Sequence, residues 1–137
     1  MKELLQRLNE QGKIVGREKT FSARVYVGCY DTERDLTRPL MEVKSICQEF
    51  VNDEGLCVNI QENWYAYGSD GEGGNEHGAV VELIHYPRFP RKNAEETITE
   101  QALRLGEILM EQLNQKRVSV LTTNDTYTLQ NPSHQEV

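Results

Sequence analysis

The stretch Gly78–Lys92, which reads GAVVELIHYPRFPRK, restricts the possible folds more than any other part of the chain. Its first half, Ala79–Tyr86, is rich in β-branched and large apolar residues and predicts a strand that is buried on at least one face. Pro87 lacks a backbone donor, so the strand should end there. The following Arg88–Lys92 contains a second proline, which favours a stiff cationic turn. We therefore expect a buried strand that presents guanidinium groups and one phenyl ring at its end.

Hydrophobic spacing predicts the other elements of the chain. Apolar residues alternate with polar ones in three further strands, Phe21–Tyr30, Leu56–Gln61 and Val118–Thr123. They recur at helical spacing in three helices: Lys2–Asn9, a second from about Thr37 to Gly55, and a third from Asn93 to Gln115. We expect Thr37 and Asn93 to cap their helices, and Glu96 to complete a capping box with Asn93.

The segment Gly68–Gly78 contains five glycines and is predicted to be a flexible hairpin loop. Its acidic residues do not have the spacing of an EF-hand, so we predict no metal site there. The sequence leaves open whether this loop covers a pocket or simply lies in solvent.

The order of these elements is strand, helix, strand, strand, helix, strand. It predicts an α+β fold, the ferredoxin-like split β-α-β sandwich, with an antiparallel sheet in the spatial order 4-1-3-2. The two main helices should cover one face of the sheet, and a short N-terminal helix is added. A chain of 137 residues is long enough to bury one core. We predict a single domain over 1–137, with an N-terminal helix and arm over 1–20, a core over 21–129 and a flexible tail over 130–137.

Composition narrows the classes of partner and compartment. A formal net charge of −7 opposes general attraction to duplex nucleic acid. The three cysteines form no Cys-x-x-Cys pair and lie in apolar stretches, which favours buried thiols in a reducing compartment over disulfides or zinc. No apolar run approaches the length of a membrane span, and the N-terminus lacks the apolar region of a signal peptide. We expect a cytosolic protein with no membrane partner.

The predicted topology brings three distant segments to one edge of the sheet. The start of the first strand and the ends of the third and fourth strands should meet there, as a small-molecule site requires. The candidate ligand-binding residues are Phe21, Arg24, Tyr26, Tyr86, Arg88, Phe89, Arg91, Asn124, Asp125 and Thr126. The planar arginine fork suits phosphate oxygens, and a ring beside it stacks on a base. An equally open interpretation is that Arg24 and Arg88 only pair with Glu82 or Asp125 on an exposed face.

Signatures of catalysis are few. His85 lies within a strand pattern, where a single histidine is usually structural. The chain has no Gly-x-Ser-x-Gly elbow and no paired-histidine zinc motif. We therefore predict no catalytic residue, no cofactor and no metal.

Several segments carry a resemblance to a known family. They are Arg24–Asp31 (RVYVGCYD), Gly55–Val58 (GLCV), Tyr86–Arg91 (YPRFPR) and Asn114–Val120 (NQKRVSV). Over about Ala23 to Leu129 the chain resembles the first-described type of phage anti-Thoeris sponge proteins. The resemblance implies an immune-evasion protein that binds and sequesters a cyclic ADP-ribose isomer without cleaving it. It also implies a homo-oligomer, a dimer or a hexamer, that can hold cyclic di- or trinucleotides.

If the resemblance holds, the predicted edge receives roles in nucleotide binding. Phe89 would stack on adenine, and Asn124 and Asp125 would contact ribose hydroxyls. The three arginines of the candidate set would meet the phosphates. These roles depend on the predicted geometry.

Other interpretations of the sequence remain open. Arg117 lies at the opposite end of the sheet and suits a second site or a subunit interface. A small ferredoxin-like enzyme that uses His85 or a tyrosine as acid–base is the first alternative function. A structural dimerisation module is the second.

Overall fold

The structure is a computed structural model that describes residues 1–17, 19–69, 71–84 and 93–134. Its elements are α1 (Lys2–Glu10), β1 (Ser22–Gly28), β2 (Tyr30–Asp31), β3 (Leu36–Thr37), α2 (Leu40–Glu54), β4 (Val58–Ser69), β5 (Glu72–Ile84), α3 (Ala94–Gln112), β6 (Arg117–Thr122), β7 (Thr126–Gln130) and a short 3-10 helix, Pro132–His134. No helix in these ranges is both long enough and apolar enough to cross a membrane.

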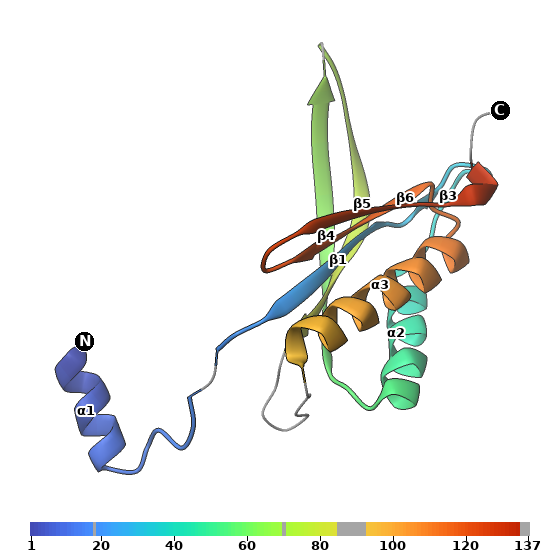
Figure 1. Cartoon of the computed structure of the whole chain (residues 1–137). Coiled ribbons are helices and arrows are strands. Elements are labelled where there is room, and N and C mark those ends of the chain that lie inside the picture. The colour runs from blue at the N-terminus through green and yellow to red at the C-terminus, as the bar shows by residue number, and fades with distance from the viewer. Residues whose placement is uncertain (18, 70, 85–92, 135–137) are drawn as a thin grey trace.

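The predicted fold class is confirmed. An antiparallel sheet runs in the order β4-β5-β1-β6-β7, and β2 and β3 form a separate ribbon. The four predicted strands correspond to β1, β4, β5 and β6, so the predicted order 4-1-3-2 is present, with β7 added at the edge. Both α2 and α3 lie on one side of this sheet, whereas α1 stands apart from it at the end of an extended arm (Figure 1). The proposed division into arm, core and tail stays a prediction.

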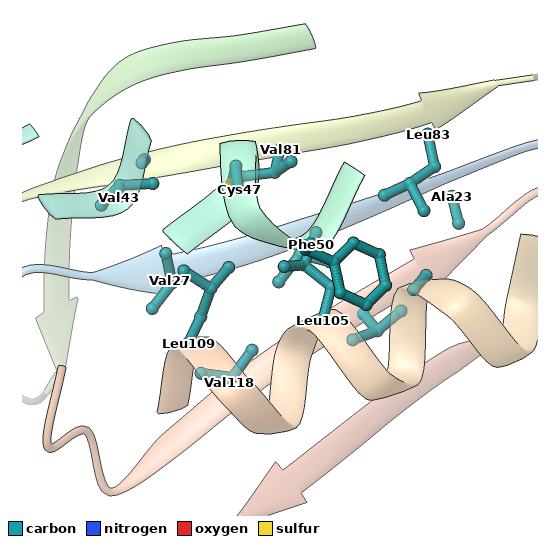
Figure 2. Close-up of a cluster of buried hydrophobic side chains, with 14 of the residues drawn as sticks. Ala23, Val27, Val43, Cys47, Phe50, Val81, Leu83, Leu105, Leu109 and Val118 are labelled. Carbon is teal, nitrogen blue, oxygen red and sulfur yellow. The ribbon is translucent and has the colours of Figure 1, made fainter. Parts of the chain in front are cut away.

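The core lies between the sheet and the two helices. In β1 the alternate residues Val25 and Val27 are buried, as their spacing predicts, and the residues between them face away. Leu105 and Leu109 of α3 and Phe50 of α2 close the core from the helical side (Figure 2). Fully burying a side chain of this size stabilises a fold by roughly 1.5–3 kcal/mol. This apolar layer fixes which face of every strand is left for function.

The second face of the sheet is covered by neither α2 nor α3, and we call it the open face. Its positions follow from the pairing register, and they are mostly polar. They include Arg24, Tyr26 and Gly28 of β1; Asn59, Gln61, Asn63 and Tyr65 of β4; Glu76, Gly78, Val80 and Glu82 of β5; and Ser119 and Leu121 of β6.

The predicted hairpin is present, but the predicted loop over Gly68–Gly78 is wrong, because most of this segment is paired strand. Strands β4 and β5 pair continuously from Val58 opposite Leu83 to Ser69 opposite Glu72, and the resulting hairpin projects from the body (Figure 1). Only Gly71, with φ of 82°, serves the turn itself. Two other glycines make room for cross-strand rings, since a Cβ at Gly78 would overlap the ring of Tyr65 and one at Gly74 the ring of Tyr67. The glycine-rich composition therefore reflects close packing along a hairpin.

The predicted helix starts also need correction. Thr37 does not cap α2, because it lies in β3 opposite Tyr30, and α2 begins at Leu40 after Pro39. Asn93 precedes α3 with φ of 51° and makes no side-chain cap hydrogen bond, so the capping box is not formed. In contrast, Gly55 ends α2 in the left-handed conformation, as predicted.

The cysteines follow the prediction in two cases of three. Cys29 and Cys47 are buried, and burial raises the pKa of these thiols to about 11 and about 12. Cys57 is exposed, contrary to the expectation, although its neighbour Leu56 is buried and Val58 packs against the core.

Candidate ligand-binding site on the open face

The ends of three strands meet as the topology predicts. Ser22 at the start of β1 pairs with Ile84 at the end of β5, and its carbonyl oxygen accepts a hydrogen bond of 3.1 Å from the backbone of Thr123, just after β6. Tyr86, Arg88, Phe89 and Arg91 lie outside the described residues. Their predicted binding roles therefore stay predictions.

The described members of the predicted site are divided between two places. Phe21 lies on the core side and Arg24 on the open face, because residues an odd number apart in a strand point to opposite faces. Phe21 and Asp125 line a hollow of about 780 Å³ beside the start of α3. Arg24 and Tyr26 line a separate hollow of about 320 Å³ on the open face.

The remaining predicted residues line neither hollow. The Asn124 side chain donates a hydrogen bond of 3.1 Å to Glu95. Thr126 pairs with Leu121 across β6 and β7. Arg117 is exposed at the other end of β6, opposite Gln130, where the sequence placed it.

The larger hollow is acidic. Its lining includes Glu95, Glu96, Glu100 and Asp125, and no lysine or arginine lines it among the residues that the structure describes. Carboxylates at this density repel phosphate oxygens. The described part of this edge therefore does not offer the cationic mount that the sequence suggested.

The open-face hollow contains an ion pair. The Arg24 Nε donates to Glu82 Oε2 at 2.7 Å across β1 and β5. This is the pairing with Glu82 that the sequence left open for Arg24. The hollow also contains three amide side chains of β4, those of Asn59, Gln61 and Asn63, above the floor residue Val80.

Next to this hollow, a carboxylate lies over a glycine. Glu76 of β5 is half-buried, and a Cβ at Gly28 of β1 would overlap its Oε1. Burial raises the pKa of Glu76 above its ordinary value. The Gln115 side chain lies beside it and is itself held by donating 2.8 Å to the Tyr30 carbonyl oxygen. Gly28 therefore makes the space in which a partly desolvated carboxylate sits.

A tyrosine ring flanks the carboxylate. Tyr65 is directly opposite Glu76 in the register of β4 and β5, and its ring covers Gly78. Its hydroxyl donates 3.0 Å to the Ala79 carbonyl oxygen, and burial raises its pKa. A carboxylate beside an aromatic ring suits a cationic, partly apolar group, because the ring face and the carboxylate both attract positive charge.

The sequence missed both Glu76 and Tyr65. Each lies in a segment that was interpreted as a loop or as hairpin packing, so neither received a role. Their positions follow only from the pairing register, in which Tyr65 lies opposite Glu76 and Tyr67 opposite Gly74. No local pattern of the sequence indicates that register.

Comparisons with known proteins give structural neighbours only. No protein-family model matches the chain, and no curated protein matches it. Solved structures match its fold, and two of them are structures of phage SAM lyase. Phage SAM lyase in complex with S-methyl-5'-thioadenosine has a TM-score of 0.64 and 20% sequence identity. Phage SAM lyase in the apo state has a TM-score of 0.69 and 19% identity. In each case the match covers 89% of this chain and 99% of the other.

These neighbours correct the predicted function and partners. Both are named as a lyase acting on SAM (S-adenosylmethionine), and one holds S-methyl-5'-thioadenosine. They contradict a non-catalytic protein that sequesters a cyclic ADP-ribose isomer, and they give no support to cyclic di- or trinucleotides as ligands. The resemblance to the anti-Thoeris sponge family is not tested by these comparisons and stays a prediction.

Proposed function

We propose that this chain binds SAM and cleaves it, releasing S-methyl-5'-thioadenosine. The fold matches that of phage SAM lyase over nearly the whole length of the neighbour, at an identity that carries no function by itself. The observation that carries the proposal is the half-buried Glu76 carboxylate, held over Gly28 and beside Tyr65 on the open face.

The charge of the molecule supports a cationic ligand. The chain has a formal net charge of −7, and both hollows beside β1 contain carboxylates. SAM carries a sulfonium and an ammonium against one carboxylate, so it is a net cation. A cyclic ADP-ribose isomer carries a pyrophosphate and is an anion. Long-range attraction therefore favours SAM over the anion.

Release of S-methyl-5'-thioadenosine breaks the bond between the sulfonium sulfur and Cγ of the aminobutyrate chain. The electron pair of that bond returns to sulfur, which leaves as a neutral thioether. Two routes account for the bonds and electrons at Cγ. In the first, the carboxylate of the substrate attacks Cγ and closes a lactone. In the second, a base removes a proton from Cβ and a Cβ–Cγ double bond forms.

Glu76 and Tyr65 fit both routes. The reaction removes a positive charge from sulfur, so a site that replaces water around the sulfonium favours the transition state over the ground state. Tyr65 and the carboxylate of Glu76 would hold the sulfonium there. In the second route Glu76 would accept the Cβ proton, a role helped by its raised pKa. We further propose that the protein acts in the cytosol, where SAM is made.

The test is turnover of SAM by the purified chain, followed by chromatography and mass spectrometry of S-methyl-5'-thioadenosine. A sample without protein measures spontaneous breakdown. We expect Glu76→Gln to lower the catalysed rate by at least about 100-fold. Glu49→Gln, which removes an exposed carboxylate of α2 on the opposite side of the sheet, should leave the rate unchanged.

The two routes give isomeric products, so proton NMR of the four-carbon product distinguishes the lactone from the alkene. Formation of S-methyl-5'-thioadenosine at the rate of the protein-free sample would overturn the proposed lyase. Equal loss of rate in Glu76→Gln and Glu49→Gln would remove Glu76 from the site.

A further inference from the structure

The open-face hollow has the size of a subsite. Its volume of about 320 Å³ is at the lower limit for small-molecule sites, so it suits one end of a ligand better than a whole nucleoside. Its lining is polar except for Val80 at the floor and the ring of Tyr26. A polar hollow of this size favours a small, multiply hydrogen-bonding group.

Within the described residues, the ion pair in this hollow leaves some of its hydrogen-bonding groups without a partner. Arg24 uses Nε for Glu82, whereas a guanidinium has five N–H donors. Glu82 accepts through Oε2, and among the described residues no donor occupies its Oε1. Arg24 is about half exposed and Glu82 about a quarter, so a ligand can reach both. The pair presents one charge of each sign, a short distance apart.

The amides beside the pair add directional groups. Within the described ranges, neither Asn59 nor Gln61 hydrogen-bonds to another side chain. Other amides of the chain do find partners, such as Gln48, which donates 2.9 Å to Asn52. Each free amide offers two donors and one acceptor toward the hollow.

We propose that this hollow is a subsite for a zwitterionic α-amino acid group. Arg24 would bind its carboxylate through the guanidinium fork, and Glu82 would accept from its ammonium. Asn59 and Gln61 would complete the hydrogen bonds. The chemical class of ligand follows from the paired charges and the polar lining.

The position of this subsite relative to Glu76 fits the length of SAM. In this respect the inference rests on the proposed function. Successive open-face residues of a strand are about 7 Å apart. A group held over Val80 therefore extends toward Gly78, where the Tyr65 ring and the Glu76 carboxylate lie. The aminobutyrate chain of SAM separates carboxylate and sulfonium by a comparable length. The subsite would hold the amino acid end, with the sulfonium next to Glu76.

The experiment compares two ligands that differ in the amino acid end. S-adenosylhomocysteine contains that end and is not cleaved at a sulfonium, whereas S-methyl-5'-thioadenosine lacks it. Affinities are measured by isothermal titration calorimetry for the wild type and for Arg24→Gln/Glu82→Gln, which leaves the net charge unchanged. We expect the double variant to lower the affinity for S-adenosylhomocysteine by about 10- to 100-fold, as loss of one or two charge-assisted hydrogen bonds implies. Its affinity for S-methyl-5'-thioadenosine should not change.

The matched control is Arg104→Gln/Glu54→Gln, which removes a second ion pair, of 2.9 Å, between α3 and α2. It should change neither affinity. If the open-face variant lowers the affinity for both ligands equally, or for neither, the proposed subsite is wrong.

A further experiment tests the subsite even if the chain is not a SAM lyase. If wild-type protein neither cleaves SAM nor binds either nucleoside, the same variants are tested with L-methionine by NMR titration. Shifts of Asn59 and Gln61 amide signals in the wild type, lost in Arg24→Gln/Glu82→Gln, would keep the amino acid subsite without the lyase. Absence of those shifts would overturn the subsite as well.

Discussion

Two carboxylates of this chain sit in opposite environments. Asp31 is fully buried, and its oxygens accept hydrogen bonds from the backbone N–H groups of Glu33 and Arg34 at 3.1 Å. They also accept from the side chains of Arg34, Arg38 and Asn114, at 2.8, 3.3 and 3.0 Å. Burial alone would raise the pKa of Asp31, but these hydrogen bonds outweigh it and hold the pKa well below its usual range. This carboxylate is fixed as an anion and stabilises the fold.

Glu76 is the opposite case. It is only half-buried, yet among the described residues it accepts no hydrogen bond, and burial raises its pKa. Gly28 and the ring of Tyr65 lie next to the Glu76 carboxylate, and neither carries a positive charge that would pair with it. The comparison teaches that the number of donors, more than the depth of burial, separates a structural carboxylate from one available to a ligand or a proton.

The largest expected effect on stability is from Asp31. Asp31→Asn keeps the shape but removes the charge that Arg34 and Arg38 pair with, so the melting temperature should fall by about 10 °C at neutral pH. Thermal unfolding followed by circular dichroism checks this. Asp53→Asn, an exposed position on α2, is the control and should change little.

The difference in melting temperature between the wild type and Asp31→Asn should depend on pH. Because the folded-state pKa of Asp31 is lowered, its contribution is complete above the ordinary aspartate pKa of about 3.9 and is lost as the pH falls toward the folded-state pKa. The melting temperatures of wild type and Asp31→Asn should therefore converge below about pH 4. A constant difference from pH 7 to pH 3 would contradict a charge-dependent role.

A smaller effect on stability, with a large effect on function, is expected from Gly28→Ala. The new methyl group would overlap Oε1 of Glu76, and the flexible end of that side chain would move away. We expect the melting temperature to change by only a few degrees, about the range of Gly→Ala changes. The rate of S-methyl-5'-thioadenosine formation should fall to that of Glu76→Gln. Gly16→Ala, where a Cβ meets nothing, is the matched control.

The sequence predicted the sheet because its strands alternate cleanly. Val25 and Val27 of β1 face the core as their spacing requires, and the long α3 follows its apolar stripe. The element order then restricts the topology to very few arrangements. What the sequence could not predict was how far β4 and β5 pair into their hairpin, because glycine is a turn residue by composition and a space-making residue only by pairing.

The candidate site was less predictable for the same reason. Arg24 and Tyr26 were placed on the correct face by alternation, but Phe21 was grouped with them although it lies on the other side of the sheet. Glu76 reveals itself only when β5 brings it beside Gly28, 48 positions earlier in the chain. Desolvation of a carboxylate depends on such non-local contacts, and no local pattern carries them.

The smallest expected effect, and the finest test of the two carboxylates, is the stability of Glu76→Gln. A carboxyl whose folded-state pKa is raised opposes folding once the pH exceeds its ordinary value, because the folded protein holds the charge in a less favourable place than the unfolded chain does. Removing that charge should raise the melting temperature slightly at pH 7, whereas Asp31→Asn lowers it. The gain should disappear below the ordinary glutamate pKa of about 4.3, where the wild type is also protonated. Differential scanning calorimetry at pH 7 and pH 4 measures both values. A lower melting temperature for Glu76→Gln at pH 7 would mean that Glu76, like Asp31, is a structural anion and is not held available for a ligand.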